Sequence, residues 1–265
     1  MIEDKKLIFH LDSYSFTYAV FHPDKNYVSN LKTYHIDNTL KKKNSTQITN
    51  FINNDLHLQQ NYSKILGVLD TTPTTFIPES LFDPKNLDKY IKLIHNANDP
   101  TQYSKQKFTN CYSISTINSE LNTVLQEKFK KLILKNFASI LVDYSIYLNR
   151  GNEKEVFLNI KEKQFHITLV NEKTLIFYNQ FSFDTINDFL YYFMNCIHVL
   201  KLNPIKTKVN IITNLDKTNQ IFNALKTYIK FIQFATRPNE LLYSNEILND
   251  PEHTHHNILS QLICE

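Results

Sequence analysis

A carboxylate and two hydroxyl groups stand close together at residues 11–15, between two runs of alternating apolar residues. The alternation predicts a tight hairpin between two strands, with Asp12, Ser13 and Ser15 at its tip. A carboxylate can position a metal ion, and hydroxyl groups can hold phosphate oxygens. We therefore treat these three residues as candidates for a phosphate loop. Tyr14 stands in the same turn, where its ring would obstruct a bound phosphate.

Two later turns could contribute to such a site. Residues 170–173 form a polar turn between two predicted strands, and residues 213–216 follow a later strand. Thr213 and Asn214 are the candidate residues of the second turn. Asparagine tolerates left-handed backbone geometry, so each turn by itself could still approach a ligand.

The glycine content argues against tight phosphate binding. Backbone N–H groups that approach phosphate oxygens usually need glycine, which allows the approach and a positive φ. Average usage of roughly 7% predicts about nineteen glycines in this length. The chain has two, Gly67 and Gly151, and neither lies in the three turns.

Histidines and acidic residues form weaker patterns. His253, His255 and His256 could bind a metal, but they lack a clear ligand frame, and we expect a solvent-exposed tail instead. Asp70 and Asp143 each end or interrupt an apolar run. They could form a carboxylate pair for acid–base work, but caps at strand ends are the preferred interpretation.

No known catalytic or metal-binding motif occurs in the sequence. Cys111, Cys196 and Cys264 are odd in number and widely spaced, so they indicate neither a disulfide framework nor a zinc site. HExxH, GxSxG, GxGxxG and Walker-type patterns are also missing. We therefore predict no catalytic residue and no metal site.

Composition places the chain among globular proteins. Its 265 residues are 42% hydrophobic and 13% aromatic, enough for one large domain or two modest ones. The net charge is +3, and the one basic run, residues 41–43, is interpreted as a solvated helix surface. The charged start and the lack of an 18-residue apolar window predict a soluble, cytoplasmic protein without membrane insertion.

Two segments share one order of elements. Period-2 alternation predicts three strands in each, and a helix and a fourth strand follow. The first copy has strands near 7–11, 14–20 and 27–36, a helix near 39–55 and a strand at 63–70. The second has strands near 155–162, 163–170 and 173–183, a helix near 186–197 and a strand at 208–213. Asp184 is the expected N-cap of the second helix, and Asp188 is expected to favour its N-terminus by charge.

The remaining segments are less regular. Residues 74–78 are bracketed by prolines, residues 85–96 are expected to form a short helix, and residues 98–105 an exposed loop. A strand near 111–115, a helix over 117–131 and a helix or strand–helix unit over 137–148 complete the first half. Later segments are a helix at 215–229, a strand at 231–234 and a short terminal helix at 252–264.

The repeated order predicts an α/β protein with a duplicated ribonuclease-H-like fold, the architecture of the actin-like ATPases. Each subdomain would have a βββαβ core and a mixed sheet. We expect the first subdomain at 1–150, with an irregular central part at 71–150, and the second at 151–265. The C-terminal helix could pack back on the first subdomain.

Aromatic and structural motifs also resemble a particular family. Residues 75–78 with 81–82, residues 179–181 with 188–192, and the closing Cys264-Glu265 are similar to the hallmarks of the bacterial domain-of-unknown-function family 3822. The resemblance covers nearly the whole chain. It implies the actin-like ATPase fold, and it brings no established activity and no known catalytic roles.

The resemblance also implies where nucleotide chemistry would lie. An active actin-like ATPase holds phosphates between two hairpin loops, one in each half, and an acidic residue in each half helps position the metal and the attacking water. Here the loops lack glycine, so the main hypothesis is a non-catalytic actin-like domain, a pseudo-ATPase that acts as an interaction or scaffold protein. It would need no cofactor and would have an unidentified protein partner.

Two alternatives remain open. One is an ATP-binding kinase or ATPase with atypical phosphate loops built on Asp12 and Ser13, which would use ATP and Mg²⁺. The other is a nucleic-acid-associated protein, which needs a contiguous basic face. For the interaction hypothesis, Phe181, Phe183, Tyr191 and Tyr192 are candidates for a partner surface, although core packing is the default interpretation of such rings.

Overall fold

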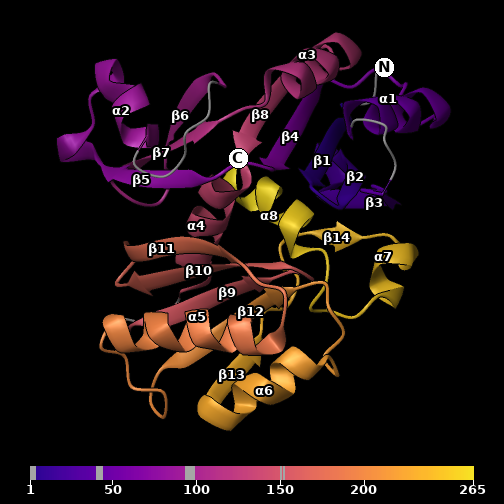
Figure 1. The fold of residues 1–265 in the computed structure, drawn as a ribbon. Coiled ribbons are helices and arrows are strands. Elements are labelled where there is room, and N and C mark those ends of the chain that lie inside the picture. The colour runs from indigo at the N-terminus through magenta and orange to yellow at the C-terminus, as the bar shows by residue number, and fades with distance from the viewer. Residues whose placement is uncertain (1–3, 40–43, 93–98, 150, 152) are drawn as a thin grey trace.

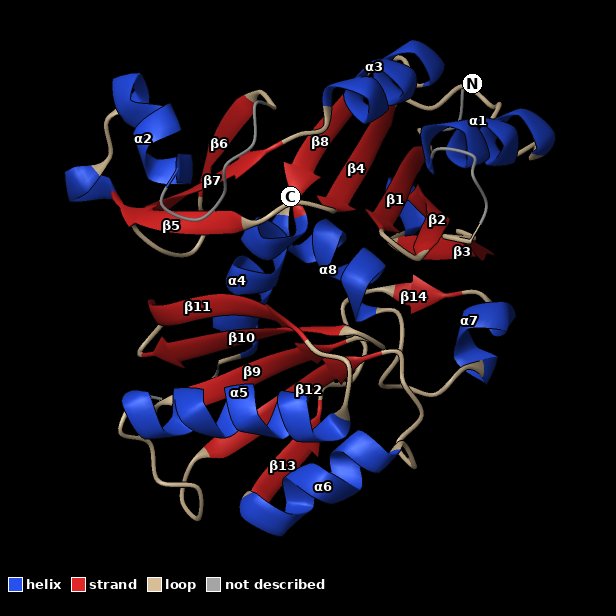
Figure 2. Ribbon diagram, in the orientation of Figure 1, coloured by secondary structure: helices blue, strands red, loops and turns tan. Residues whose placement is uncertain are grey.

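Two sheets lie on opposite sides of the helices α4 (Phe137–Leu148) and α8 (His256–Cys264), as Figure 1 shows. The computed structural model describes residues 4–39, 44–92, 99–149, 151 and 153–265. A third, smaller sheet lies beside the first (Figure 2). The chain is therefore mixed α/β, as predicted.

The first sheet has the order β14-β3-β2-β1-β4-β8. Its strands are β1 (Lys6–Asp12), β2 (Ser15–His22), β3 (Tyr27–His35), β4 (Lys64–Asp70), β8 (Leu132–Asn136) and β14 (Leu242–Tyr243). Strands β1 to β3 form an antiparallel meander, and β4 lies parallel to β1. Helices α1 (Asn44–Asn54) and α3 (Ser119–Lys128) pack on its outer side.

The second sheet repeats this arrangement with the order β11-β10-β9-β12-β13. Its strands are β9 (Glu155–Ile160), β10 (Gln164–Asn171), β11 (Thr174–Ser182), β12 (Lys208–Thr213) and β13 (Phe231–Phe234), with α5 (Ile186–Val199) and α6 (Gln220–Tyr228) on its outer side. Strand β9 takes the place of β1, because it pairs antiparallel with the next strand and parallel with the strand after the helix. The predicted duplicated fold is confirmed.

The third sheet is inserted between β4 and β8 and has the order β5-β7-β6. It contains β5 (Thr74–Pro78), β6 (Thr101–Lys105) and β7 (Cys111–Thr116), with α2 (Leu87–Lys92) beside it. The prediction of an exposed loop at 98–105 is wrong for β6, because backbone pairing with β7 organises a polar sequence that alternation did not reveal. Short 3₁₀ turns lie at Pro23–Lys25, Glu79–Leu81 and Pro84–Asn86, and α7 (Asn245–Asn249) follows β14.

Helix starts follow local hydrogen bonding. Thr185, rather than the predicted Asp184, is the N-cap of α5, because its side chain accepts from the Asp188 N–H while the Asp188 carboxylate accepts from the Thr185 N–H. This reciprocal capping box satisfies two N–H groups that the helix cannot pair internally. The prediction for Asp188 at this helix start is confirmed.

Close packing explains the one glycine within a strand. Gly67 on β4 is the register partner of Phe9 on β1. A Cβ at residue 67 would lie 2.2 Å from a Phe9 ring atom and 2.7 Å from Leu134. The phenylalanine ring therefore uses the space that any other residue at position 67 would fill.

Helix α8 joins the two halves through side chains. The Gln261 amide donates to the Phe9 carbonyl over 2.9 Å, and the Asn159 amide donates to Asn257 Oδ1 over 2.7 Å. Those partners belong to β1 and β9, the matching central strands of the two sheets. The division of the chain at residue 150 stays a prediction, since β14 and α8 follow the second sheet in sequence yet contact the first.

The prediction of an exposed histidine tail is wrong. His253 and His256 are 3% and 1% exposed, because the segment leading into α8 enters the space between the halves. The His256 ring lies 2.9 Å from the Tyr144 hydroxyl and 3.2 Å from the Ala235 carbonyl. His253 contacts the Leu215 carbonyl, and His255 contacts the Asp250 carboxylate.

Candidate functional site

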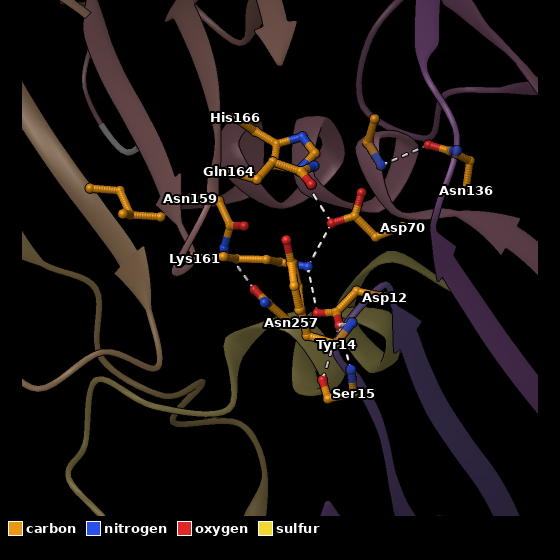
Figure 3. A network of polar contacts seen from close by, with 12 residues as sticks. Asp12, Tyr14, Ser15, Asp70, Asn136, Asn159, Lys161, Gln164, His166 and Asn257 are labelled. Atoms are coloured by element: carbon orange, nitrogen blue, oxygen red, sulfur yellow. Dashed lines mark hydrogen bonds and ion pairs between the residues drawn. The ribbon is translucent and has the colours of Figure 1, made fainter. Parts of the chain in front are cut away.

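Two carboxylates meet where β1 and β4 end. Asp12 and Asp70 are register partners at the ends of these parallel strands, so the strand geometry brings both side chains to the same edge. Lys161 follows β9 in the other half. Its Nζ atom lies 2.9 Å from Asp12 Oδ2 and 2.6 Å from Asp70 Oδ2 (Figure 3). One ammonium group therefore joins both carboxylates and both halves of the molecule.

His166 on β10 extends this network. Its Nε2 atom lies 3.2 Å from Asp70 Oδ2, and its Nδ1 atom lies 2.8 Å from the Tyr178 hydroxyl. An ionised carboxylate can only accept, so the Asp70 contact requires a proton on Nε2, and Nδ1 can then accept from the hydroxyl. The Gln164 side chain also lies within 3.0 Å of Nε2. The Tyr178 ring packs edge-on against Phe76 of β5 at a centroid distance of 5.0 Å.

The start of α4 forms the apolar wall of the cleft. Asn136 caps the helix by accepting from the Ala138 N–H, which holds the Phe137 ring beside the ion pairs. The Lys161 ammonium lies 4.9 Å from the centroid of that ring, within the range of a cation–π contact. His10 packs edge-on against the same ring.

The charges in the cleft hold one another in place. Burial works to raise the pKa of Asp70, but attraction to the Lys161 ammonium and to His166 is stronger, and the pKa lies well below its usual value. Burial also opposes the charge on Lys161, yet Asp70 and Asp12 keep the pKa of the amine above its ordinary value. Burial, reinforced by the Lys161 charge, lowers the pKa of His10 to about 4. At neutral pH the cleft therefore contains a closed set of ion pairs and a neutral His10.

The predicted first loop is present, but hydrogen-bond donors of the loop are paired with the Asp12 carboxylate of the same loop. Asp12 Oδ1 accepts from the N–H groups of Tyr14 and Ser15 over 2.9 and 2.8 Å, and from the Ser15 hydroxyl over 3.1 Å. Ser13 is exposed, and its carbonyl accepts from the Asn38 amide. Of the three candidates, the structure joins Asp12 and Ser15 directly. Two N–H groups that could face a phosphate are thus directed at a carboxylate.

Thr213 and Asn214 also have internal partners. The Thr213 hydroxyl donates to the Ile160 carbonyl over 2.7 Å and accepts from the Leu215 N–H over 3.0 Å. Asn214 Oδ1 accepts from the His255 N–H over 2.8 Å. These contacts tie the end of β12 to β9 and to the entry of α8, which is a structural role.

The prediction that the turn at 170–173 contributes to the site is wrong. Residues 170–173 join β10 to β11, whereas the hairpin that faces Asp12 joins β9 to β10 and contains Lys161 and Lys163. Residues 161–163 form the first turn of the meander, and residues 172–173 form the second. Superposing the two βββαβ patterns would have found the first turn, since His10-Leu11-Asp12 and Asn159-Ile160-Lys161 occupy matching positions.

The remaining polar predictions have separate outcomes. Asp143 lies within α4 and accepts from the N–H groups of Lys107 and Phe108, so it caps a loop rather than a strand end and does not pair with Asp70. Among the described residues, no group of three or more His, Cys, Asp or Glu side chains is arranged to hold a metal ion. The basic run at 41–43 lies outside the described residues, and the nucleic-acid hypothesis stays a prediction.

The four aromatic candidates for a partner surface differ in exposure. Phe183 is 6% exposed and packs on Phe189, so it belongs to the core of the second half. Phe181 and Tyr192 stack on each other at a centroid distance of 5.3 Å and are half-buried. Tyr191 is 68% exposed. The role of Phe181, Tyr191 and Tyr192 as a partner surface stays a prediction.

Comparison with known proteins agrees with this geometry. A family described as "Protein of unknown function (DUF3822)" matches residues 1–232. The chain belongs to this family. No curated protein matches the sequence.

Solved structures share the fold at low sequence identity. A Bacteroides thetaiotaomicron protein described as having an actin-like ATPase fold and unknown function is 18% identical and has a TM-score of 0.84 over 99% of this chain and 97% of its own. A chain of the PilM–PilN type IV pilus biogenesis complex is 7% identical, with a TM-score of 0.68 over 98% of both chains. The DUF3822 protein therefore has the actin-like ATPase fold.

The cleft residues do not fit the metal–nucleotide group that this fold implies. The carboxylates of Asp12 and Asp70 would have to hold a divalent cation, yet both already bind the Lys161 ammonium. Lys161 also stands where the second half would need an acidic residue.

None of the helices within the described residues is both long and apolar enough to span a bilayer.

Proposed function

We propose that this DUF3822 protein is a non-catalytic actin-like domain that acts as an interaction or scaffold protein, with a cytoplasmic location. The observation that supports the proposal most is the Lys161 ammonium between Asp12 and Asp70. A lysine in this place supplies internally the positive charge that a divalent cation would bring. It cannot offer open coordination positions to phosphate oxygens or to water.

The same contact opposes the movement that nucleotide exchange would require. Lys161 belongs to one half and both carboxylates to the other, with only 11% of its side chain exposed. Separating the halves would break both ion pairs and expose all three charged groups to water. The ion pairs therefore favour one fixed arrangement, as suits a protein that presents a surface.

Two observations support a protein partner. Tyr191 is exposed beside Tyr192 and Phe181, which gives α5 and β11 an aromatic surface. One structure with a similar fold is a chain of the PilM–PilN complex, which shows that a protein of this architecture can assemble with another protein.

A thermal-shift titration with ATP, ADP and Mg²⁺, together with a phosphate-release assay, tests the proposal. We expect no turnover and no shift for the wild-type chain. Specific binding at 100 times Kd would add about 2.7 kcal/mol and raise Tm by a few degrees. A shift with Mg-ATP, or turnover that Asp12→Ala abolishes, would instead establish the ATPase alternative.

Lys161→Ala gives the sharper form of this experiment. The substitution leaves two carboxylates facing the cavity of the missing amine, so added Mg²⁺ should raise the Tm of this variant and not that of the wild type. Lys163→Ala is the matched control, because Lys163 lies in the same hairpin with its side chain half exposed. An equal response of Lys161→Ala and Lys163→Ala to Mg²⁺ would contradict the assigned role of Lys161.

A further inference from the structure

A groove of about 790 Å³ separates the third sheet from the second sheet. Its walls come from β5, from the loop between β6 and β7, and from the start of β11. Figure 1 shows β5 above β11. The contact between the Phe76 and Tyr178 rings joins the two walls.

Both walls are unpaired sheet edges. β5 ends the order β5-β7-β6, and β11 ends the order β11-β10-β9-β12-β13. Within the described residues, no backbone hydrogen bond joins β5 to β11. Such edges carry N–H and C=O groups that can pair with another strand.

The direction of these backbone groups follows from neighbouring hydrogen bonds. The Gln180 N–H donates to Asn179 Oδ1 rather than to β10, so the backbone groups of Gln180, and by alternation those of Tyr178, point away from β10. The Glu79 N–H donates to the Asn110 carbonyl of the β7 side. By the same alternation, the backbone groups of Phe76 point away from β7. Phe76 and Tyr178 therefore direct backbone donors and acceptors toward the groove from opposite walls.

The groove offers one available lysine and has an apolar side chain at its rim. Three lysines and no Asp or Glu line it. The ammonium of Lys105 binds Glu79, and that of Lys107 donates to the Ile263 carbonyl. Lys173 is exposed and has no ion-pair partner within the described part of the chain. Ile176, which also lines the groove, is 48% exposed.

We propose that this groove binds an extended, acidic peptide segment of a partner protein. The segment pairs its backbone with the free edges of β5 and β11, places an acidic side chain near Lys173, and covers Ile176 with an apolar side chain. An extended segment fits better than a helix, because a helix consumes its own backbone groups and cannot pair with a sheet edge. The inference rests on the proposed function, and it specifies where the partner binds and what kind of segment it contributes.

The test uses a displayed library of random linear 12-residue peptides, selected on the wild-type chain and remade as fluorescent synthetic peptides. We expect selected sequences in which acidic residues alternate with β-branched residues. Lys173→Glu should weaken their binding at least tenfold. Lys201→Glu is the matched control, since Lys201 is also exposed and also has a positive φ, and it should change binding less than twofold.

A methyl scan of the selected peptide tests backbone pairing directly. N-methylation at every second position should reduce binding at least tenfold, and methylation at the positions between should have little effect. Hydrogen exchange of the complex should show protection of amides in 74–78 and 177–182. Enrichment of no peptide, equal binding to Lys173→Glu, or protection confined to α5 would overturn the proposal.

The outcomes also separate this inference from the proposed function. Peptides that protect α5 near Tyr191 would refute the groove but leave an interaction protein. Turnover of Mg-ATP would refute the proposed function whatever the peptides do. A dimer in sedimentation that Lys173→Glu dissociates would show that a second copy occupies the groove, and would overturn the assignment to a foreign peptide.

Discussion

The cleft around Lys161 and the groove between β5 and β11 both separate elements of the two halves, yet they treat their polar groups in opposite ways. In the cleft, Lys161, Asp12, Asp70 and His166 satisfy one another within 3.2 Å. In the groove, the edges of β5 and β11 pair with no further strand of the described residues. The polar groups of the cleft are thus paired with one another, whereas the strand edges beside the groove are free to pair with another chain.

The comparison shows that location in a fold and availability for binding are separate properties. Two acidic residues at the ends of parallel strands resemble a cation site. In this cleft, however, the Lys161 ammonium already occupies the place between them. A polar edge strand carries no recognisable motif, although its backbone groups can pair with another extended chain. Three changes would break or sharpen this contrast, ordered by the expected effect of a single group, from the largest to the smallest.

Lys161→Ala should destabilise the fold most. Removing one partner of a buried ion pair leaves uncompensated charge, and the expected loss is about 3–5 kcal/mol of unfolding free energy, measured by urea denaturation. A second variant, Lys161→Met with Asp12→Asn and Asp70→Asn, removes the charges together and should recover most of that loss. A loss below about 1 kcal/mol for Lys161→Ala would show that the cleft is not held closed by these ion pairs.

Acid should lower the free energy of unfolding through two buried histidines. Burial lowers the pKa of His10 and of His256 from 6.5 to about 4. Between these values the unfolded chain binds protons that the folded chain does not, so stability falls as the pH drops from about 6.5 to about 4. The expected loss is about 3 kcal/mol for each histidine.

Denaturation at several pH values checks this expectation. The variant His256→Gln should lose less stability on acidification than the wild type. His198→Gln, which changes an exposed histidine on α5, should behave like the wild type. If His256→Gln loses as much stability on acidification as the wild type, His256 does not control the acid sensitivity.

Lys173→Gly should have the smallest effect, and in the opposite direction. Residues 172 and 173 both have positive φ, a conformation that costs roughly 1–2 kcal/mol for residues with a side chain and nothing for glycine. The variant should therefore raise stability by about 1 kcal/mol while removing the charge that the peptide proposal needs. Lys201→Gly should stabilise the chain similarly at φ 54° and keep peptide binding.

Much of the architecture could be predicted from the sequence, because period-2 and helical alternation depend on neighbouring residues alone. The alternation predicts the βββαβ order, a strand near 111–115 and a helix or strand–helix unit over 137–148, and the structure has β7 and α4 in the last two places. The polar strand β6 was missed because it is organised by pairing with β7, which lies later in the chain.

The candidate site was predicted only in part. Asp12 and Ser15 are local to one hairpin, so their spacing revealed them. Lys161 and His166 meet Asp70 across 91 and 96 residues of sequence, and neither carries a motif. The histidines near 255 were placed on the surface, since nothing in their own sequence shows that a helix will enter between two sheets.

That helix has a consequence for the order in which the protein can form. A ribosome makes both meanders before it makes α8, so the early chain lacks the Gln261 and Asn257 contacts that link β1 to β9. Until residues 256–264 emerge, the two sheets share only α4 as a helix packed between them. The contacts that link β1 to β9 through α8 can therefore form only after its residues have emerged, whereas α4 and the Lys161 ion pairs can join the halves earlier.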